Sequence, residues 1–229
     1  MIINTDNSPS LFSRALRKSK TVAEQTIFVV DDDERHCESI QFLLSMAGYR
    51  VETFNSPLEI LRDYDDSRPG CVLLDVSMPE MEGDVLQQRL KDAGKLASIV
   101  FVTAHAHIPS AVSTVRKGAI DYLEKPYDKD RLLSVVQKAL AIDAKAREDL
   151  RVVRESQARI EELTPREREV FELVVVGKAN KNIAADLGIA VKTVELHRSR
   201  VMKKTGADSV PDLVKLKMQA ENGAQTALQ

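Results

Sequence analysis

The sequence has no apolar run long enough to form a membrane-spanning helix. Crossing a bilayer takes about 20 consecutive apolar residues, and no stretch of this 229-residue chain approaches that length. Residues 1–24 also lack the apolar core of a secretory signal peptide. Their segment LFSRALRKSK has a faint likeness to a transit peptide, but its polar composition favours a disordered tail. These absences predict a cytoplasmic protein with no membrane partner.

Cysteine is nearly absent as well. The chain has two cysteines, Cys37 and Cys71, and two residues cannot form the network of disulfides that stabilises small secreted domains. Both are surrounded in sequence by apolar residues. We therefore expect reduced thiols buried in a core, which agrees with a reducing cytoplasm.

Net charge is small, but the −2 of the whole chain conceals two halves of opposite sign. Residues 25–142 hold 13 Lys and Arg against 19 Asp and Glu, a net of −6, whereas residues 163–218 hold 11 against 7, a net of +4. An acidic first half favours a site for a cation or a phosphoryl group, and a basic second half favours a polyanion. A chance distribution of surface charge is the alternative, and it is a strong one for the basic half taken alone.

Residues 25–142 alternate between short apolar segments and segments with helical periodicity. This alternation predicts βαβ units in which a parallel five-stranded sheet has helices on both faces. The predicted strands are 26–30, 49–54, 71–75, 98–103 and 119–123. The predicted helices are 38–48, 56–64, 83–94, 109–118 and 128–141.

The rest of the chain predicts an all-α region. Residues 143–162 are charged and helical, which indicates a linker; a short seam for helix pairing is an alternative, although two heptads are too few for a coiled coil. Residues 163–220 read as four short helices, the first of which begins with a capping box at Thr164 and Glu167. Residues 221–229 are predicted to be a disordered tail.

Polar side chains follow the predicted strands where each strand ends. Asp31 and Asp32 follow the first strand, Asp75 ends the third, Thr103 ends the fourth, and Lys125 comes after the fifth. Because the carboxyl ends of parallel strands meet at one edge of a sheet, these side chains should converge there. Neighbouring carboxylates repel one another, so a cation and the lysine must compensate. Ligation by oxygen alone suits Mg²⁺ better than zinc.

Such a site could perform phosphoryl transfer. A carboxylate beside Mg²⁺ can attack a phosphoryl group and form an acyl phosphate. Lys125 would pair with a phosphoryl oxygen, and Thr103 would donate a hydrogen bond to another. The sequence offers no general base for rapid hydrolysis, so the phosphoryl group could persist as a signal.

Each of these residues has an ordinary alternative when it is considered alone. Residues 31–33 could be acids favoured at a helix N-terminus by the helix dipole, and we expect Asp33 to cap the first helix rather than to bind metal. Asp75 could be a turn residue. His105 and His107 could suggest a metal pair, but they follow a strand without further ligands, which favours solvated loop histidines.

The segments VVDDDE, LLDVSMPEMEG, FVTAHA and YLEKP together resemble the receiver domain of two-component response regulators, which has a flavodoxin-like (βα)5 fold. The resemblance implies that Asp75 accepts a phosphoryl group from a sensor histidine kinase. It also implies that Asp31, Asp32 and Asp75 hold Mg²⁺ together with the backbone carbonyl of Ser77. A receiver of this kind is no enzyme and dephosphorylates itself slowly at most.

The same resemblance implies a switch in the receiver. Thr103 would turn towards the phosphoryl group, and Tyr122 would reorient into the space left; a plain core aromatic is the alternative for Tyr122. Lys125 precedes Pro126, whose peptide bond the family often has in cis.

The segment NIAADLGIAVKTVELH has the spacing of a helix-turn-helix, with its turn at Gly188. On a helix over about 191–204, one face mixes charged and polar residues with a leucine, which suits the major groove of DNA. That face consists of Lys192, Glu195, Leu196, Ser199 and Lys203, and the residues that flank it and could reach phosphates are Arg198, Arg200 and Lys204. The alternative is a solvated face of a small helical bundle.

Residues 163–218 also resemble the LuxR-type output domain of NarL/FixJ-subfamily regulators, through LTPREREV, NKNIAADLGIAVKTVELHRSRVMKK and SVPDLVKLKMQ. This resemblance implies binding to promoter DNA through the 192–199 face and dimerisation through the final helix. Glu195 in the middle of that face departs from the commoner pattern, so individual base contacts cannot be carried over.

The sequence thus predicts a transcriptional regulator that phosphorylation at Asp75 converts to a DNA-binding homodimer. Two rivals stay open. An acyl-phosphate hydrolase could use the same site, although Ser77 stands where such enzymes usually carry a second acid. A receiver that acts through protein contacts could use the basic half as a docking bundle.

Overall fold

The computed structural model describes residues 25–104 and 119–226, which form two compact units divided between Lys145 and Ala146. The predicted helix over 109–118, the histidines His105 and His107, the tail over 1–24 and residues 227–229 lie outside the described residues. None of the helices that the structure describes is long and apolar enough to cross a membrane.

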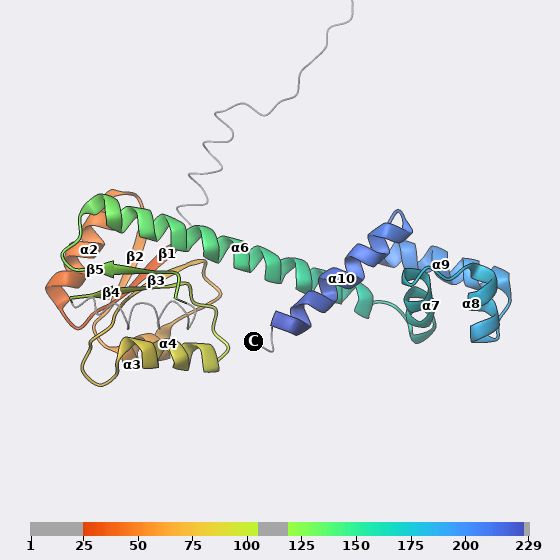
Figure 1. The fold of residues 1–229 in the computed structure, drawn as a ribbon, viewed down its shortest axis with the longest axis horizontal. Helices are drawn as coiled ribbons and strands as arrows, with labels where there is room; N and C mark the ends of the chain where they lie inside the picture. The colour runs from red at the N-terminus through yellow and green to blue at the C-terminus, as the bar shows by residue number, and fades with distance from the viewer. Residues whose placement is uncertain (1–24, 105–118, 227–229) are drawn as a thin grey trace, which may run out of the picture. The chain divides into compact units, whose positions relative to one another are not determined.

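The first unit contains a parallel sheet of five strands in the order β2-β1-β3-β4-β5 (Figure 1). The strands are β1 (Thr26–Val30), β2 (Arg50–Phe54), β3 (Gly70–Asp75), β4 (Ile99–Thr103) and β5 (Asp121–Glu124). Each predicted strand is present, and its bounds differ from the prediction by at most two residues. The helices that accompany the sheet are α2 (Glu34–Met46), α3 (Pro57–Asp63), α4 (Gly83–Asp92) and α6 (Lys129–Glu161).

Alternating side chains of the strands form two cores, one on each face of the sheet. Ile27, Leu73 and Val100 pack with α2 and α6, whereas their neighbours Phe28 and Val72 pack on the opposite face with α3 and α4. Apolar residues on both sides of β1, β3 and β4 are what a sheet covered on both faces requires. The flavodoxin-like fold is confirmed.

Both cysteines are buried and free, as expected for core thiols. Cys71 lies on β3 and Cys37 on α2, within the same core. Burial raises the pKa of the Cys37 thiol to about 11, and a nearby carboxylate, Asp31, adds to this effect. The two thiols therefore stay protonated and inert.

The helix α6 extends beyond the first unit. The sequence predicted a helix over 128–141 and a helical linker over 143–162, and the structure has both within one continuous helix of 33 residues. Its first half supplies Leu132 and Val136 to the core of the sheet, and Asp143, which is fully buried, accepts a hydrogen bond from the backbone N–H of Gly70 at 3.0 Å.

The second unit contains the end of α6 and four further helices, as predicted. These are α7 (Pro165–Val175), α8 (Asn180–Leu187), α9 (Val191–Thr205) and α10 (Val210–Thr226). The predicted capping box is present: Thr164 caps the N–H of Glu167, whose side chain accepts from the N–H of Thr164. Gly188 and Gly206 end α8 and α9 in the left-handed conformation that glycine adopts without strain.

Two details of the second unit correct or refine the predictions. Residues 221–226 are helical rather than a disordered tail, as the last part of α10. The predicted seam on α6 is partly used within the chain itself. Ser156 is buried against Gln219, and the Gln157 amide donates to the Ala220 carbonyl at 3.1 Å.

Candidate functional site

The register of the sheet brings the predicted acids together. Val30 of β1 is paired with Leu74 of β3, so the next residues, Asp31 and Asp75, lie beside each other at the carboxyl edge. One carboxylate oxygen from each of Asp31, Asp32 and Asp75 lies within 4.8 Å of the others. Asp31 and Asp75 are buried, whereas Asp32 is exposed.

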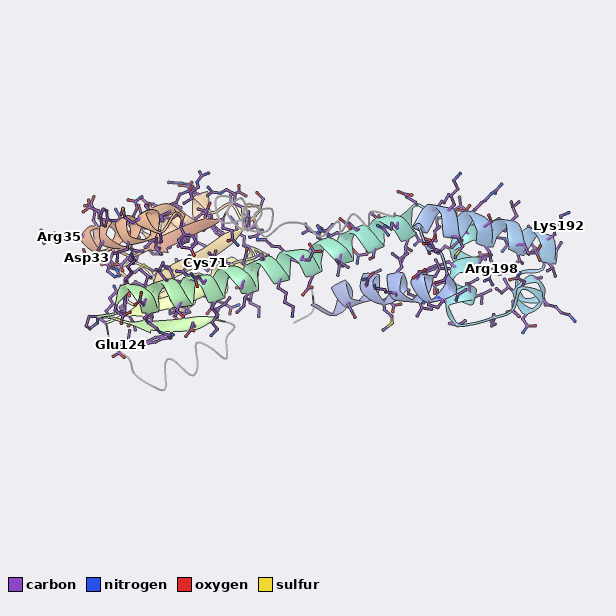
Figure 2. All side chains as sticks on the ribbon, turned by 90° about the horizontal axis from the view of Figure 1, so that it is seen from above. Asp33, Arg35, Cys71, Glu124, Lys192 and Arg198 are labelled. Carbon is purple, nitrogen blue, oxygen red and sulfur yellow. The ribbon has the colours of Figure 1, made fainter. Side chains whose placement is uncertain are left out.

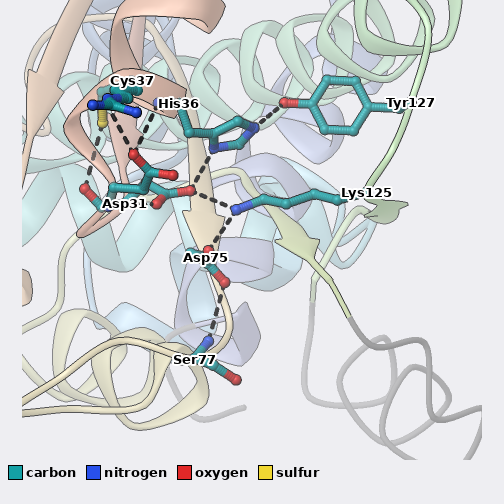
Figure 3. Close-up of polar contacts among 9 residues, drawn as sticks. Asp31, His36, Cys37, Asp75, Ser77, Lys125 and Tyr127 are labelled. Carbon is teal, nitrogen blue, oxygen red and sulfur yellow. Dashed lines mark hydrogen bonds and ion pairs between the residues drawn. The ribbon is translucent and has the colours of Figure 1, made fainter.

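Lys125 reaches this cluster from the segment after β5 (Figure 3). Its ammonium donates to Asp31 Oδ2 at 2.8 Å and to Asp75 Oδ2 at 2.7 Å. Its backbone N–H is fixed by the Thr103 carbonyl at 2.7 Å, and the Lys125–Pro126 peptide bond is cis, as the resemblance implies. The predicted convergence of residues from β1, β3 and β5 is thus present in the structure.

The charge of the cluster indicates what it can hold. The three carboxylates carry −3 and Lys125 carries +1, which leaves −2 at one edge of the sheet. All the acidic ligands offer oxygen, and the exposed Asp32 leaves the cluster open to water. This donor set fits a hard divalent cation such as Mg²⁺.

The two buried acids differ in how easily they ionise. Burial acts to raise the pKa of Asp31, but hydrogen bonds from His36 and Lys125 more than offset it and hold that pKa well below the usual range. Burial also acts on Asp75, and there the bond from Lys125 does not offset it, so the pKa of Asp75 is raised. The charge of Asp75 is therefore the one that the fold itself disfavours.

Backbone groups around Asp75 fix its position. The N–H of Ser77 donates to Asp75 Oδ1 at 3.1 Å. Gly83, at the start of α4, lies so close that a Cβ there would stand 2.4 Å from the Asp75 carbonyl oxygen. Ser77 is exposed beside the cluster, and its predicted use of the backbone carbonyl as a metal ligand stays a prediction.

Asp33 has the expected role. Its side chain caps α2 by accepting hydrogen bonds from the backbone N–H groups of Arg35 at 3.0 Å and His36 at 3.4 Å. Its own N–H donates to Asp31 Oδ1 at 2.9 Å. The third aspartate of the row therefore holds the helix and one ligand in place.

His36 and Tyr127 belong to the site, and the sequence reasoning missed both (Figure 3). His36 Nδ1 lies 2.6 Å from Asp31 Oδ2, and His36 Nε2 lies 2.6 Å from the Tyr127 hydroxyl. Their positions held a signal: His36 is in the first turn of α2, directly after the acids, and Tyr127 follows Lys125 by two residues.

The proposed switch pair lies on adjacent strands. Thr103 is buried at the end of β4, and Tyr122 of β5 is partly exposed and packs against the core that contains Phe101. Tyr122 is paired in register with Phe101. The segment that would complete the switch, residues 105–118, lies outside the described residues, so the roles of Thr103 and Tyr122 stay predictions.

The helix-turn-helix of the second unit consists of α8 and α9. Ile183, Ala184 and Val194 are buried in the core between α8 and α9, and Gly188 makes the turn. On α9, the whole predicted reading face is exposed: Lys192, Glu195, Leu196, Ser199 and Lys203. Leu196 is 51% exposed, so its side chain is available on this face. Figure 2 shows Lys192 near the N-terminal end of α9.

Two of the flanking cations are engaged within the unit. Arg198 donates to the side-chain oxygen of Asn180 at 2.9 Å. Lys204 donates to Glu167 Oε2 at 2.7 Å and to the Glu162 carbonyl at 3.1 Å. Lys204 is thus paired with the buried Glu167 within the unit, and the phosphate contacts predicted for Arg198 and Lys204 stay predictions. Arg200 is exposed.

Comparisons with known proteins cover both units. The family described as response regulator receiver domain matches residues 27–137, and the family described as bacterial regulatory proteins, luxR family, matches residues 161–222. The response regulator protein TmoT of Ectopseudomonas mendocina is 37% identical over 193 residues, which span 84% of this chain and 88% of TmoT.

Two further relatives agree with these matches. The transcriptional regulatory protein FixJ of Bradyrhizobium diazoefficiens is 37% identical over 194 residues, which span 85% of this chain and 95% of FixJ. The solved structure of the response regulator StyR has a TM-score of 0.79 at 37% identity, and the match covers 86% of this chain and 99% of StyR. The similarity therefore extends across receiver and output regions alike.

Proposed function

This chain belongs to the two-component response regulators, with a receiver domain followed by a LuxR-type DNA-binding domain, and from that membership we propose that phosphorylation of Asp75 controls its binding to DNA. The observation that carries the proposal is the ammonium of Lys125, which bridges Asp75 at 2.7 Å and Asp31 at 2.8 Å. Lys125 and Asp75 are 50 residues apart in sequence, so only the fold brings them together.

The proposed reaction transfers a phosphoryl group from a sensor histidine kinase. A carboxylate oxygen of Asp75 forms a bond to phosphorus while the bond from phosphorus to the imidazole nitrogen of the kinase breaks, and the product is an acyl phosphate. Lys125 then pairs with one phosphoryl oxygen, and the hydroxyl of Thr103 donates to another. Mg²⁺, held by Asp31, Asp32, Asp75 and the Ser77 carbonyl, would neutralise charge on the transferring group.

The output of the signal is DNA binding through α9. The exposed face from Lys192 to Lys203 presents polar groups for base edges and Leu196 for a thymine methyl. We propose that activation turns the chain into a homodimer through α10, so that two copies of α9 reach half-sites about one helical turn apart. Slow self-dephosphorylation would end the signal, and the cytoplasm is the compartment in which such a regulator meets promoter DNA.

Labelling tests the receiver half of this proposal. The full chain is incubated with Mg²⁺ and a small radioactive phosphodonor, and incorporation is compared for the wild type, Asp75→Asn and the control Asp92→Asn. Asp92 is an exposed acid on α4 away from the cluster. The wild type and the control should take up label, and Asp75→Asn should not. Label retained by Asp75→Asn would show that another residue is the acceptor.

A gel-shift experiment tests the output half. Duplex DNA of random sequence at low salt should be retarded by the full chain, because the electrostatic part of DNA binding needs no specific site. No retardation by the wild type would instead favour the rival in which the second unit only docks onto another protein.

A further inference from the structure

His36 stands between a proposed metal ligand and a tyrosine. Its side chain is 19% exposed and lies in the first turn of α2. Nδ1 is 2.6 Å from Asp31 Oδ2, and Nε2 is 2.6 Å from the hydroxyl of Tyr127, which belongs to the segment between β5 and α6 (Figure 3). The imidazole therefore has a polar partner at each ring nitrogen.

The chemistry of Asp31 fixes the direction of one of these hydrogen bonds. An ionised carboxylate only accepts, so Nδ1 of His36 carries a proton and donates it to Asp31. When the ring is neutral, Nε2 is an acceptor and the Tyr127 hydroxyl donates to it. In either protonation state the Tyr127 hydroxyl contacts the ring and can orient it.

The effect on Asp31 is to use one of its two oxygens fully. An ionised carboxylate has about four lone-pair sites, two on each oxygen. Among the described residues, Oδ2 accepts from Lys125 at 2.8 Å and from His36 at 2.6 Å, whereas Oδ1 accepts from the N–H of Asp33 at 2.9 Å. Oδ1 is thus the oxygen with capacity left for a cation.

We propose that His36, oriented by Tyr127, is a positioning residue that fixes the Asp31 carboxylate for a divalent cation. This inference rests on the proposed function, because it takes Asp31 to be a metal ligand. Groups that hold a ligating side chain in one orientation commonly contribute about 10- to 100-fold to metal affinity or activity. Without the bond from His36, Lys125 would be the one side chain among the described residues that donates to Asp31. The Asp31 carboxylate could then rotate about its Cβ–Cγ bond.

Two substitutions of His36 separate its role in orienting Asp31 from the space that its side chain fills. The side-chain amide of Asn in His36→Asn occupies roughly the place of Nδ1 and keeps a donor for Asp31, but it cannot reach Tyr127. The longer Gln in His36→Gln places its amide near Nε2, where it can meet Tyr127 but not Asp31. Tyr127→Phe removes only the hydroxyl, and Arg35→Gln, an exposed neighbour on the same turn of α2, is the control.

The measurement is the affinity of the full chain for Mg²⁺ at one fixed pH. Because the chain has no tryptophan, the titration follows amide NMR shifts rather than intrinsic fluorescence. His36→Gln should bind Mg²⁺ about 10-fold more weakly than wild type, Tyr127→Phe should lose a smaller factor, and His36→Asn and Arg35→Gln should stay close to wild type. Thermal unfolding in EDTA should show His36→Asn and His36→Gln destabilised alike.

The outcomes are distinguishable. If His36→Gln binds Mg²⁺ as tightly as wild type, or if the Asn and Gln variants lose the same factor, His36 does not position Asp31. If the wild type itself binds no Mg²⁺, the metal site of the proposed function fails, and the role of His36 fails with it.

Discussion

Asp75 is a carboxylate whose charge the folded receiver disfavours. Burial raises its pKa more than the bond from Lys125 lowers it. A carboxyl group with a raised folded pKa is most compatible with the fold at low pH, and stability is lost as the pH rises through the interval between its unfolded and folded pKa values. Once ionised, the proposed acceptor therefore weakens the fold that holds it.

Removing the charge should therefore stabilise the protein when metal is absent. In EDTA, Asp75→Asn should raise the free energy of unfolding by about 1 to 3 kcal/mol, the scale of a desolvation penalty. Excess Mg²⁺ should narrow the difference, since the ionised carboxylate then has a cation. Thermal unfolding with EDTA and with MgCl₂ measures both effects, with Asp92→Asn as control. A variant less stable than wild type in EDTA would contradict this account.

Glu167 is the opposite case. The hydrogen bond from Lys204, with a further one from the N–H of Thr164, lowers the pKa of Glu167 from 4.5 to about 2. A depressed pKa means that the ionised group stabilises the fold above its unfolded value, and that this contribution is lost as the pH falls towards the folded value. Glu167 should thus support the second unit at neutral pH and stop doing so in acid.

The corresponding test is Glu167→Gln in the full chain. At neutral pH the substitution should lower the free energy of unfolding of the second unit by about 1.5 to 3 kcal/mol, the range for a hydrogen bond to a charged group. The difference in free energy of unfolding between variant and wild type should disappear as the pH falls from about 5 to about 2. Glu169→Gln, an exposed acid on the same helix that pairs with Arg166, is the matched control. A difference in free energy of unfolding that stays constant in acid would exclude an ionic role for Glu167.

The sequence was sufficient to predict the acids and Lys125 at the site, because each follows an apolar strand and the edge of a parallel sheet collects such residues. It was not sufficient for His36 and Tyr127. They are 91 residues apart, and neither a period nor a motif links a helical histidine to a loop tyrosine. The ion pair of Lys204 was not predicted for a similar reason, since its partner Glu167 lies 37 residues away on another helix.

At the scale of helices and strands, α9 presents adjacent lysines with different surroundings. Lys203 is exposed on the same face as Lys192, whereas Lys204 is turned towards Glu167 and Glu162. The two side chains carry the same charge and differ by one position, so they make a matched pair. We expect Lys203 to contact phosphate and Lys204, which pairs with Glu167, to support the bundle.

Substitution of each lysine by methionine should separate these roles. Lys203→Met should weaken binding to any duplex and reduce the slope of log affinity against log salt by about 1, because one phosphate contact is lost. Lys204→Met should leave the slope unchanged and instead lower the temperature of unfolding. Gel shifts over a series of salt concentrations measure the slope. A flatter slope for Lys204→Met than for Lys203→Met would reverse the assignment.

The presence of each strand and helix was predicted more reliably than the residues at which it begins and ends. The five strands follow from their apolar, β-branched runs. The apolar period placed the start of the first helix at residue 38, whereas α2 begins at Glu34, directly after the cap that Asp33 was expected to provide. At its other end, α10 continues to Thr226, beyond the last residue of the predicted domain. Local polar interactions decide where helices end, and hydrophobic periodicity records them poorly.

At the scale of the whole molecule, α6 is the helix that contains residues of both units. Its first half fills the core of the receiver with Leu132 and Val136, and its second half meets α10 through Ser156 and Gln157. The sequence predicted a helical linker over residues 143–162, and the helix runs through them without a break. We expect this continuous helix to transmit the state of the receiver to the second unit.

Breaking α6 at the boundary between the units should uncouple phosphorylation from DNA binding. Lys145 is exposed and is the last residue of the first unit, so Lys145→Pro disturbs little except the helix, at a cost of about 3 kcal/mol in a helix interior. The variant should still take up label at Asp75 and should still bind DNA at low salt.

The gain in DNA affinity that phosphorylation gives the wild type should be reduced several-fold in Lys145→Pro. The control Lys145→Ala, which keeps the helix, should retain that gain. Gel shifts before and after treatment with the phosphodonor measure the gain, and a gain in Lys145→Pro equal to that of Lys145→Ala would mean that the continuity of α6 does not transmit the signal.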